Sequence, residues 1–285
     1  MRNRCNEKMP KAPIPYFGGK CNYVDDILPL VPVHKCYLEP FAGAASILLA
    51  KDRAEIEIYN DLDHNISTFY KVLRDDFDEL RRLVELTPYS REEMHICWAS
   101  LKNPNLSDMA RARAFFAVSR MAFSGKFTSK PGLSSSKMKD NASSWLYGID
   151  CLYEVHQRIR GVTIENLDAI KVIKKYDGKE TFIYLDPPYL PETRPKSTKA
   201  YLQEMGRTKH AEMLGTIVDC KSMILLSGYH NELYDEVLYG WHFKDWTVTS
   251  TASHTARGEE RKRLETLWWN DALDNKRVGK QLSFV

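Results

Sequence analysis

The sequence lacks paired cysteines, clustered histidines and long apolar runs. Its six cysteines are scattered singly without a Cys-x-x-Cys pair, and its eight histidines show no spacing typical of metal ligands. This pattern disfavours a disulfide framework or a zinc site and favours reduced thiols in a cytoplasmic protein that holds no metal. No apolar run approaches the roughly 18 residues that a membrane span requires, and the polar start of the chain lacks the apolar core of a signal peptide. We therefore expect no membrane partner.

The charge of the chain is nearly balanced overall but unevenly distributed. The 285 residues are 43% apolar and 28% charged, with a net charge of +3, as in an ordinary globular protein. Residues 52–93 hold twelve acidic and six basic residues, whereas residues 107–140 hold seven basic and two acidic ones. A basic face on a nearly neutral protein suits docking to phosphate groups, although a solvated helix surface explains such a cluster equally well.

The most informative stretch is Asp-Pro-Pro-Tyr at residues 186–189, which follows an apolar, β-branched run. Proline cannot donate to a sheet ladder, so we expect a strand that ends at Asp186. In open α/β sheets the carboxyl ends of the strands are where ligands bind. The Asp186 carboxylate and the Pro187 carbonyl could accept both hydrogens of an exocyclic amino group, and Tyr189 offers a flat face for a planar base. The alternative is an ordinary proline turn after a strand.

Residues 36–50 predict a short strand, a turn of small residues around Gly43 and an apolar helix, as in a Rossmann-like sheet. The glycine spacing of a dinucleotide site is absent, and Glu39 at the strand end would repel a pyrophosphate. A ligand with a cationic or neutral head, such as S-adenosylmethionine, fits better. Asp61 follows a second predicted strand, 18 residues beyond Gly43, where a carboxylate can accept hydrogen bonds from both ribose hydroxyls. The alternative for Asp61 is a helix N-cap.

The rest of the chain predicts a catalytic core with an inserted module. Residues 65–160 have helical periodicity, with helices expected over 107–123 and 144–160 and a hairpin or loop over 124–132. Strands and helices then alternate again, and Asp168 ends one strand. We interpret the polar, basic residues 191–209 as a mobile active-site loop, followed by a helix over 210–220. Strands over 241–249 and 263–269 without a helix between them indicate an antiparallel hairpin at one edge of the sheet.

Taken in order, the aromatic-x-Gly-Gly-Lys segment at residues 16–20, Glu-Pro-Phe-x-Gly at 39–43, Asn-Asp at 60–61 and Asp-Pro-Pro-Tyr at 186–189 resemble the motifs of the Dam-like family of DNA adenine N6-methyltransferases, particularly its phage-type members. The resemblance covers residues 16–270. It implies an α/β fold with a Rossmann-like, mixed seven-stranded sheet whose last strand is reversed. It also implies a catalytic domain formed by residues 1–64 and 161–285, with residues 65–160 as an inserted, mainly helical DNA-recognition domain.

The resemblance also implies roles for individual residues. Asp186, Pro187 and Tyr189 would grip the target adenine. Tyr16 and Lys20 would contact the methionyl end of S-adenosylmethionine, and Phe41 and Gly43 would line its pocket. Asp61 would hold its ribose, and Asp168 would accept a hydrogen bond from its adenine amine. Double-stranded DNA would be contacted by basic residues of the insert and of the later loop, namely Arg120, Lys126, Lys130, Arg194 and Lys196.

Two positions depart from the family pattern. Ala45 stands where many members have a second glycine, which is tolerable at negative φ and otherwise weakens cofactor binding. Ala169 follows Asp168 where an aromatic residue is common, so part of the packing against the cofactor's adenine must come from elsewhere.

We expect direct methyl transfer without a covalent intermediate, because the chain contains no Pro-Cys dipeptide to supply the thiolate used in cytosine ring methylation. The enzyme would be a monomer or weak dimer. Alternatives are an RNA or protein-glutamine N-methyltransferase, whose related motif usually begins with Asn, and a DNA-binding regulator that has lost catalysis.

Overall fold

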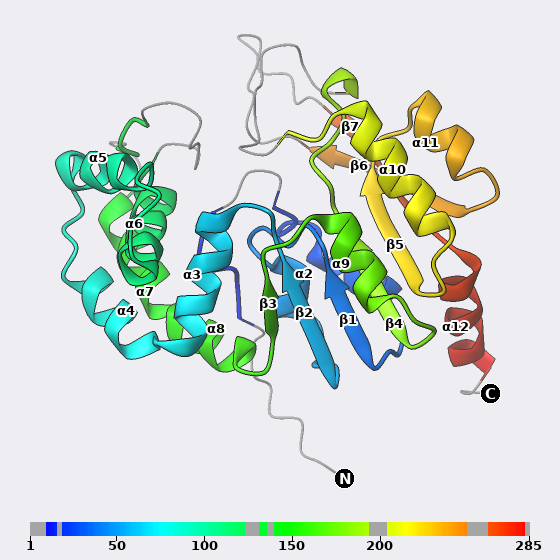
Figure 1. Ribbon diagram of the computed structural model, residues 1–285, viewed down its shortest axis with the longest axis horizontal. Coiled ribbons are helices and arrows are strands. Elements are labelled where there is room, and N and C mark those ends of the chain that lie inside the picture. The colour runs from blue at the N-terminus through cyan, green and yellow to red at the C-terminus, as the bar shows by residue number, and fades with distance from the viewer. Residues whose placement is uncertain are drawn as a thin grey trace. The chain divides into compact units, whose positions relative to one another are not determined.

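The computed structural model of the protein describes residues 10–15, 19–122, 131–135, 140–193, 204–249 and 262–282 (Figure 1). Within these residues the strands form one seven-stranded sheet in the order β3-β2-β1-β4-β5-β7-β6. The strands are β1 (Cys36–Glu39), β2 (Ile56–Asn60), β3 (Thr163–Glu165), β4 (Thr181–Leu185), β5 (Met223–Gly228), β6 (His242–Thr249) and β7 (Lys262–Trp269). The pairs β2–β3, β1–β4 and β4–β5 are parallel, whereas β7 runs antiparallel to β5 and β6. The predicted Rossmann-like sheet with a reversed last strand is confirmed.

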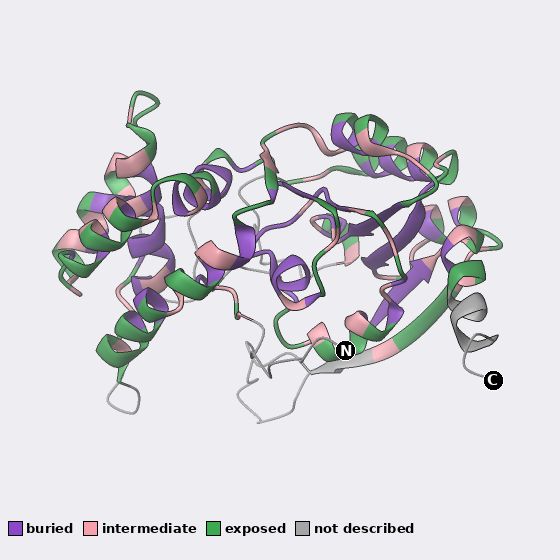
Figure 2. Ribbon diagram, turned by 90° about the horizontal axis from the view of Figure 1, so that it is seen from below, coloured by how far each residue is buried: buried purple, intermediate pink, exposed green. Residues whose placement is uncertain are grey.

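The central strands are nearly continuous apolar runs. Every residue of β4 and β5 is buried, which is the pattern of parallel strands covered on both faces (Figure 2). The predicted hairpin of the last two strands is also confirmed, with Phe243 opposite Trp268. Because β7 lies between β5 and β6, the strand at this edge of the sheet is β6.

Contacts divide the chain into two compact units, and the first comprises residues 1–31, 42–167 and 199–204. It contains β2, β3 and most of the helices. Its helices are α1 (Val24–Ile27), η1 (Leu28–Leu30), α2 (Ser46–Ala50), α3 (His64–Asp75), α4 (Phe77–Glu85), α5 (Arg91–Ser100), α6 (Asp108–Met121), α7 (Asn141–Asp150) and α8 (Leu152–Ile159). α6 packs against α3, α4 and α5 as the central helix of the insert. It begins where Ser107 accepts a hydrogen bond from Ala110 N, an N-cap that satisfies one of the donors at the helix start.

The single helix expected over residues 144–160 is wrong. The chain forms α7 and α8 instead, and the break falls at Cys151. Because position 151 is neither proline nor glycine, the sequence contains no residue there that typically ends a helix.

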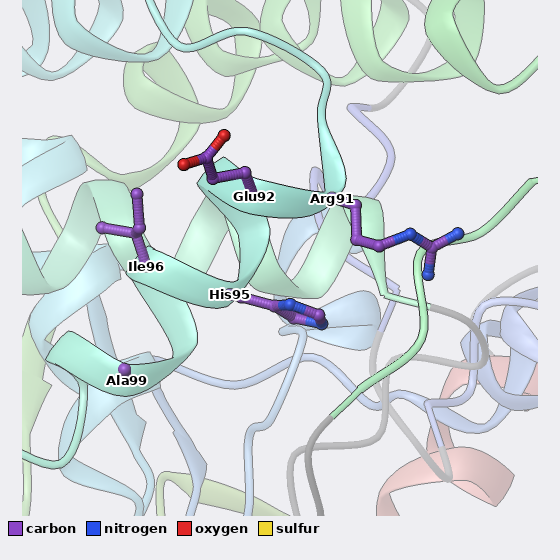
Figure 3. A pocket seen from close by; sticks show the side chains of 5 residues that line it. All are labelled: Arg91, Glu92, His95, Ile96 and Ala99. Atoms are coloured by element: carbon purple, nitrogen blue, oxygen red, sulfur yellow. The ribbon is translucent and has the colours of Figure 1, made fainter.

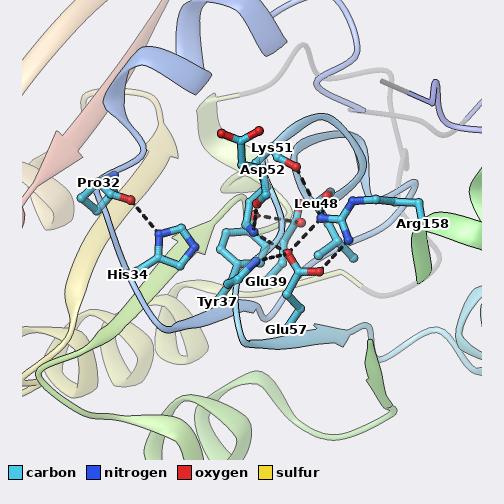
Figure 4. Close-up of polar contacts among 10 residues, drawn as sticks. Pro32, His34, Tyr37, Glu39, Leu48, Lys51, Asp52, Glu57 and Arg158 are labelled. Atoms are coloured by element: carbon cyan, nitrogen blue, oxygen red, sulfur yellow. Dashed lines mark hydrogen bonds and ion pairs between the residues drawn. The ribbon is translucent and has the colours of Figure 1, made fainter. Parts of the chain in front are cut away.

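A buried ion cluster joins elements of the first unit (Figure 4). The Glu57 carboxylate on β2 lies 2.5 Å from Lys51 Nζ and 2.5 Å from an Arg158 guanidinium nitrogen. Arg158, on α8, also donates to the carbonyl of Leu48 at 2.5 Å. The cluster therefore ties the end of the insert to β2 and α2, and removing one partner would leave an uncompensated buried charge.

The second unit comprises residues 32–41, 168–198 and 205–285. Besides β1 and β4 to β7 it holds α9 (Ala169–Tyr176), η3 (Pro191–Thr193), α10 (Arg207–Val218), α11 (Glu232–Val237) and α12 (Asp271–Leu282). α10 begins three residues earlier than predicted, so Arg207 and Lys209 lie on a helix and not in the predicted loop. Both are ion-paired, Arg207 with Glu192 at 2.8 Å and Lys209 with Glu212 at 3.0 Å. The domain boundaries predicted from the sequence stay a prediction.

Candidate active site

The turn after β4 brings the predicted catalytic residues together. Asp186 is half-buried, Pro187 is buried, and Tyr189 is only 8% exposed. The Tyr189 hydroxyl lies 3.2 Å from Asp186 Oδ1, as a donor to it, and 3.3 Å from Glu265 Oε1. The turn therefore holds its carboxylate in one orientation through its own tyrosine.

Glu265 was missed in the sequence. It lies on β7, is buried, and also accepts a hydrogen bond from the Tyr229 hydroxyl at 3.2 Å. The rings of Tyr189 and Tyr229 meet edge to face, with centroids 4.7 Å apart. The sequence did not single it out, because the same strand also contains Lys262, Arg263 and Thr266, so one more charged residue did not mark a buried group.

His210 on α10 holds the turn from the other side and was also missed. It is fully buried, with Nε2 at 3.0 Å from the Pro188 carbonyl oxygen and Nδ1 at 2.8 Å from the Tyr234 hydroxyl. Because a carbonyl can only accept, Nε2 must carry a hydrogen, and a neutral imidazole then accepts from Tyr234 at Nδ1. Burial, and next the charge of Asp186, raise the pKa of Tyr234, so this phenol keeps its proton.

In the first unit, the turn after β1 brings Gly43 and Asp61 together as predicted. Asp61 Oδ2 accepts from Gly43 N and Oδ1 accepts from Asp63 N, both at 2.8 Å. Gly43 has φ +47°, a conformation that favours glycine. The cap of α3 is Asp63, whose carboxylate accepts from Asn65 N, so Asp61 is not the N-cap.

The Asp61 carboxyl titrates near neutrality. Burial raises its pKa to about 7, and the nearby charge of Asp63 acts in the same direction. The backbone hydrogen bonds from Asp63 and Gly43 lower the pKa but do not offset the burial. A carboxylate at this position changes its charge in the physiological range.

Ala45 has φ +58° in the left-handed region. This is the case in which an alanine at this position is expected to weaken cofactor binding.

The other predicted cofactor residues are placed as follows. Lys20 is buried and Phe41 is half-buried. Asp168 caps α9 by accepting from Ile170 N at 3.0 Å, and its other oxygen lies 3.6 Å from Lys209 Nζ. Tyr16 lies outside the described residues. The cofactor roles of these residues stay predictions.

Part of the basic cluster at residues 107–140 is engaged inside the first unit. Arg111 is buried and donates to Asn65 and to the Asn103 carbonyl, and Arg113 lies 2.9 Å from Glu93. Arg120 donates to the carbonyls of Pro13 and Ser144. Burial lowers its pKa.

The remaining predicted DNA contacts (Lys126, Lys130, Arg194 and Lys196) lie outside the described residues. All five DNA-contact assignments, Arg120 included, stay predictions.

A surface hollow lies beside α5, lined by Arg91, Glu92, His95, Ile96 and Ala99 (Figure 3). It includes none of the predicted site residues. Across the described ranges, no helix is long and apolar enough to cross a membrane. In that same part of the chain, no three His, Cys, Asp or Glu side chains are grouped so as to hold a metal ion.

The model of a protein family described as D12 class N6 adenine-specific DNA methyltransferase matches residues 16–250. The chain belongs to this family. The predicted family resemblance and the predicted enzyme class, an adenine-specific DNA methyltransferase, are thereby confirmed. The family match favours this enzyme class over the alternatives, which were methylation of RNA or of protein glutamine and a DNA-binding regulator that has lost catalysis.

Two relatives match nearly the whole methyltransferase. The Type II methyltransferase M.MjaIII of Methanocaldococcus jannaschii is 22% identical over 271 residues, covering 86% of this chain and 93% of that protein. The DNA adenine methylase of Escherichia coli (strain K12) is 25% identical over 279 residues, covering 91% of this chain and 95% of that protein.

Proposed function

We propose that this methyltransferase takes its methyl group from S-adenosylmethionine and places it on N6 of an adenine flipped out of double-stranded DNA. The observation that carries the proposal is the turn after β4, where Asp186 and Tyr189 are held together by a hydrogen bond of 3.2 Å. Flipping is required because the amino group of a paired adenine is not accessible within the duplex, and it costs a few kcal/mol.

The turn can act on the base in two ways. The Asp186 carboxylate and the Pro187 carbonyl accept the hydrogens of the amino group, which aims the nitrogen lone pair toward the methyl group. The Tyr189 ring stacks on the base, a contact worth about 1–3 kcal/mol. As the N–C bond forms and the C–S bond breaks to leave a neutral thioether, the nitrogen becomes cationic, and the fixed negative charge of Asp186 would stabilise it. The surplus N6 proton would then pass to the Asp186 carboxylate and on to solvent.

The residues around Gly43 fit the cofactor. When bound, S-adenosylmethionine supplies an electrophilic methyl group on a sulfonium. Each Asp61 oxygen accepts one backbone hydrogen bond, and because a carboxylate oxygen can accept two, each retains capacity for a ribose hydroxyl. Lys20 and Tyr16 would hold the methionyl end, Phe41 and Gly43 would line the pocket, and Asp168 would accept from the adenine amine.

The decisive variant is Asp186→Asn, which keeps the size and one acceptor but loses the charge. It should bind cofactor and DNA as the parent does, while its turnover falls by about two to three orders of magnitude. Turnover is measured as N6-methyladenine released from digested DNA. Tyr189→Ala should instead weaken binding as well as rate, because it raises the cost of the flipped state. A fluorescent base analogue at the target position would report that state.

Asp219→Asn is the matched control, since it makes the same substitution at an exposed residue, the C-cap of α10, which precedes β5. It should keep parental turnover. Parental turnover in Asp186→Asn would show that the turn has no catalytic role, and the proposal would fail.

We also propose that the enzyme acts in the cytoplasm as a monomer or weak dimer, with DNA held by Arg120, Lys126, Lys130, Arg194 and Lys196.

A further inference from the structure

Two buried tyrosines hold the backbone of the turn that contains Gly43. The hydroxyl of Tyr59, on β2, donates to the Gly43 carbonyl at 2.8 Å, and the hydroxyl of Tyr70, on α3, donates to the Ala44 carbonyl at 2.7 Å. Both side chains are at most 1% exposed, and their ring centroids are 4.8 Å apart. Two consecutive peptide groups are thus fixed by side chains from two other elements.

The same turn contains a conformation that needs support. Ala45 has φ +58°, which L residues with a Cβ rarely adopt, and it is fully buried. Its N–H donates to the Ala42 carbonyl at 2.6 Å. The carbonyl that Tyr70 holds belongs to the peptide group joining Ala44 to Ala45, so the Tyr70 hydroxyl acts directly on the strained link.

The hydrogen bond from Tyr59 also sets the direction of a backbone donor. In a trans peptide the N–H points opposite to the carbonyl of the preceding residue. Because Tyr59 holds the Gly43 carbonyl, the N–H of Ala44 points away from the Tyr59 hydroxyl. On the other flank, Asp61 holds the N–H of Gly43 at 2.8 Å and so links the turn to the carboxylate assigned to the ribose.

We propose that Tyr59 and Tyr70 are positioning residues for the methyl donor, because they hold residues 43–45 in the strained conformation that binds it. The inference rests on the proposed role of Gly43 and Asp61 in holding S-adenosylmethionine. A purely structural role is the competing explanation, since buried hydroxyls require partners in any core. The two explanations differ in whether cofactor affinity depends on the hydroxyls.

The experiment measures the dissociation constant of S-adenosylmethionine by calorimetry, the turnover at saturating substrates and the melting temperature of the full-length protein. Tyr59→Phe and Tyr70→Phe each remove one oxygen and keep the ring, so the fold is retained. Each should raise the dissociation constant about fivefold to tenfold, the scale of one hydrogen bond, while saturated turnover stays within about twofold.

Rescue by Ala45→Gly supplies the sharper test. Glycine adopts φ near +58° without strain, so the turn no longer depends on the tyrosine to hold it. In the Ala45→Gly background, Tyr70→Phe should therefore weaken binding less than it does in the parent. An equal loss in both backgrounds would refute the link between Tyr70 and the strained turn.

Tyr89→Phe is the matched control, because the Tyr89 hydroxyl also donates to a backbone carbonyl of the first unit, that of Ser134, at 2.6 Å. It should lower the melting temperature without changing the dissociation constant. If Tyr59→Phe and Tyr70→Phe behave like this control while Asp61→Asn weakens binding, the tyrosines are core residues only and the inference fails. If Asp61→Asn also binds with parental affinity, the proposed cofactor site itself is wrong.

Discussion

Asp61 combines a predicted ligand contact with a pKa of about 7, so its charge and its function should vary together with pH. A carboxylate that accepts two ribose hydroxyls does so best when ionised. We expect the affinity for S-adenosylmethionine to be constant above pH 8 and to fall below pH 7, approaching tenfold per pH unit. Calorimetry between pH 5.5 and 8.5 measures this directly, and Asp61→Asn should flatten the profile. A flat parental profile would contradict the ribose assignment.

The raised pKa of Asp61 affects the stability of the ligand-free protein in the opposite direction, so that this stability falls as pH rises. The folded pKa of Asp61 is raised above its ordinary value of 3.8, so the folded state holds this proton more tightly than the unfolded state does. The contribution to stability is therefore fully present below about pH 4 and is lost as pH rises toward 7. Asp61 thus destabilises the empty fold in the pH range where it binds the cofactor best.

Residues with a local signal could be predicted from the sequence, and those defined by tertiary contacts could not. Asp186 and Tyr189 follow an apolar strand at a double proline, and Gly43 precedes an apolar helix. The Glu265 carboxylate reaches Tyr189 across 76 positions of sequence, and His210 reaches the Pro188 carbonyl across 22. No spacing rule in a single sequence connects such pairs.

At the scale of elements, α10 positions the turn after β4 through His210, whose Nε2 lies 3.0 Å from the Pro188 carbonyl oxygen. His210→Ala should lower turnover about tenfold to a hundredfold, because a small displacement of Tyr189 misaligns the base. Affinity for S-adenosylmethionine should change little. His210→Gln keeps an N–H donor near the position of Nε2 and should recover part of the turnover in the same methylation assay.

A general loss of stability must be separated from this effect. Ile217→Val removes one buried methyl group from the same helix, at its far end, and should cost about 0.5–1.5 kcal/mol. It should leave turnover at saturating substrates unchanged. If it lowered turnover as much as His210→Ala does, His210 would only stabilise α10.

Helices and strands with a clear hydrophobic pattern could be predicted from the sequence. β4 and β5 are buried throughout and mostly apolar, and the strands of the hairpin lie within one residue of their predicted bounds. The break between α7 and α8 and the start of α10 at Arg207 were not predicted. Arg207, the first residue of α10, is ion-paired with Glu192 at 2.8 Å, a partner 15 positions away that the local pattern does not show. The structure offers no explanation of the break at Cys151.

For the whole molecule, some basic residues of the insert bind partners within their own unit. Arg111 and Arg113 use their guanidinium groups within the first unit, so their positive charge contributes to its packing. Arg120 also donates to carbonyls of that unit, which does not exclude the DNA contact proposed for it. A count of charges along the sequence could not separate them from residues that bind phosphate, because their partners lie at distant positions such as Asn65 and Pro13.

The proposed DNA contacts predict how DNA binding responds to salt. Neutralised phosphates release counterions, so the slope of log affinity against log salt should become shallower by about 0.9 for each phosphate-contacting Lys or Arg removed. We expect this change for Lys126→Gln and for Lys130→Gln, measured by fluorescence anisotropy on a duplex from 50 to 300 mM salt.

Arg113→Gln removes the same charge but breaks the pair with Glu93 at 2.9 Å, so it should lower the melting temperature and leave the slope unchanged. Arg120→Gln should also make the slope shallower, because we propose that Arg120 holds DNA; an unchanged slope would show that it binds only carbonyls of its own unit. Unchanged slopes in both lysine variants would place the DNA-binding surface elsewhere on the enzyme.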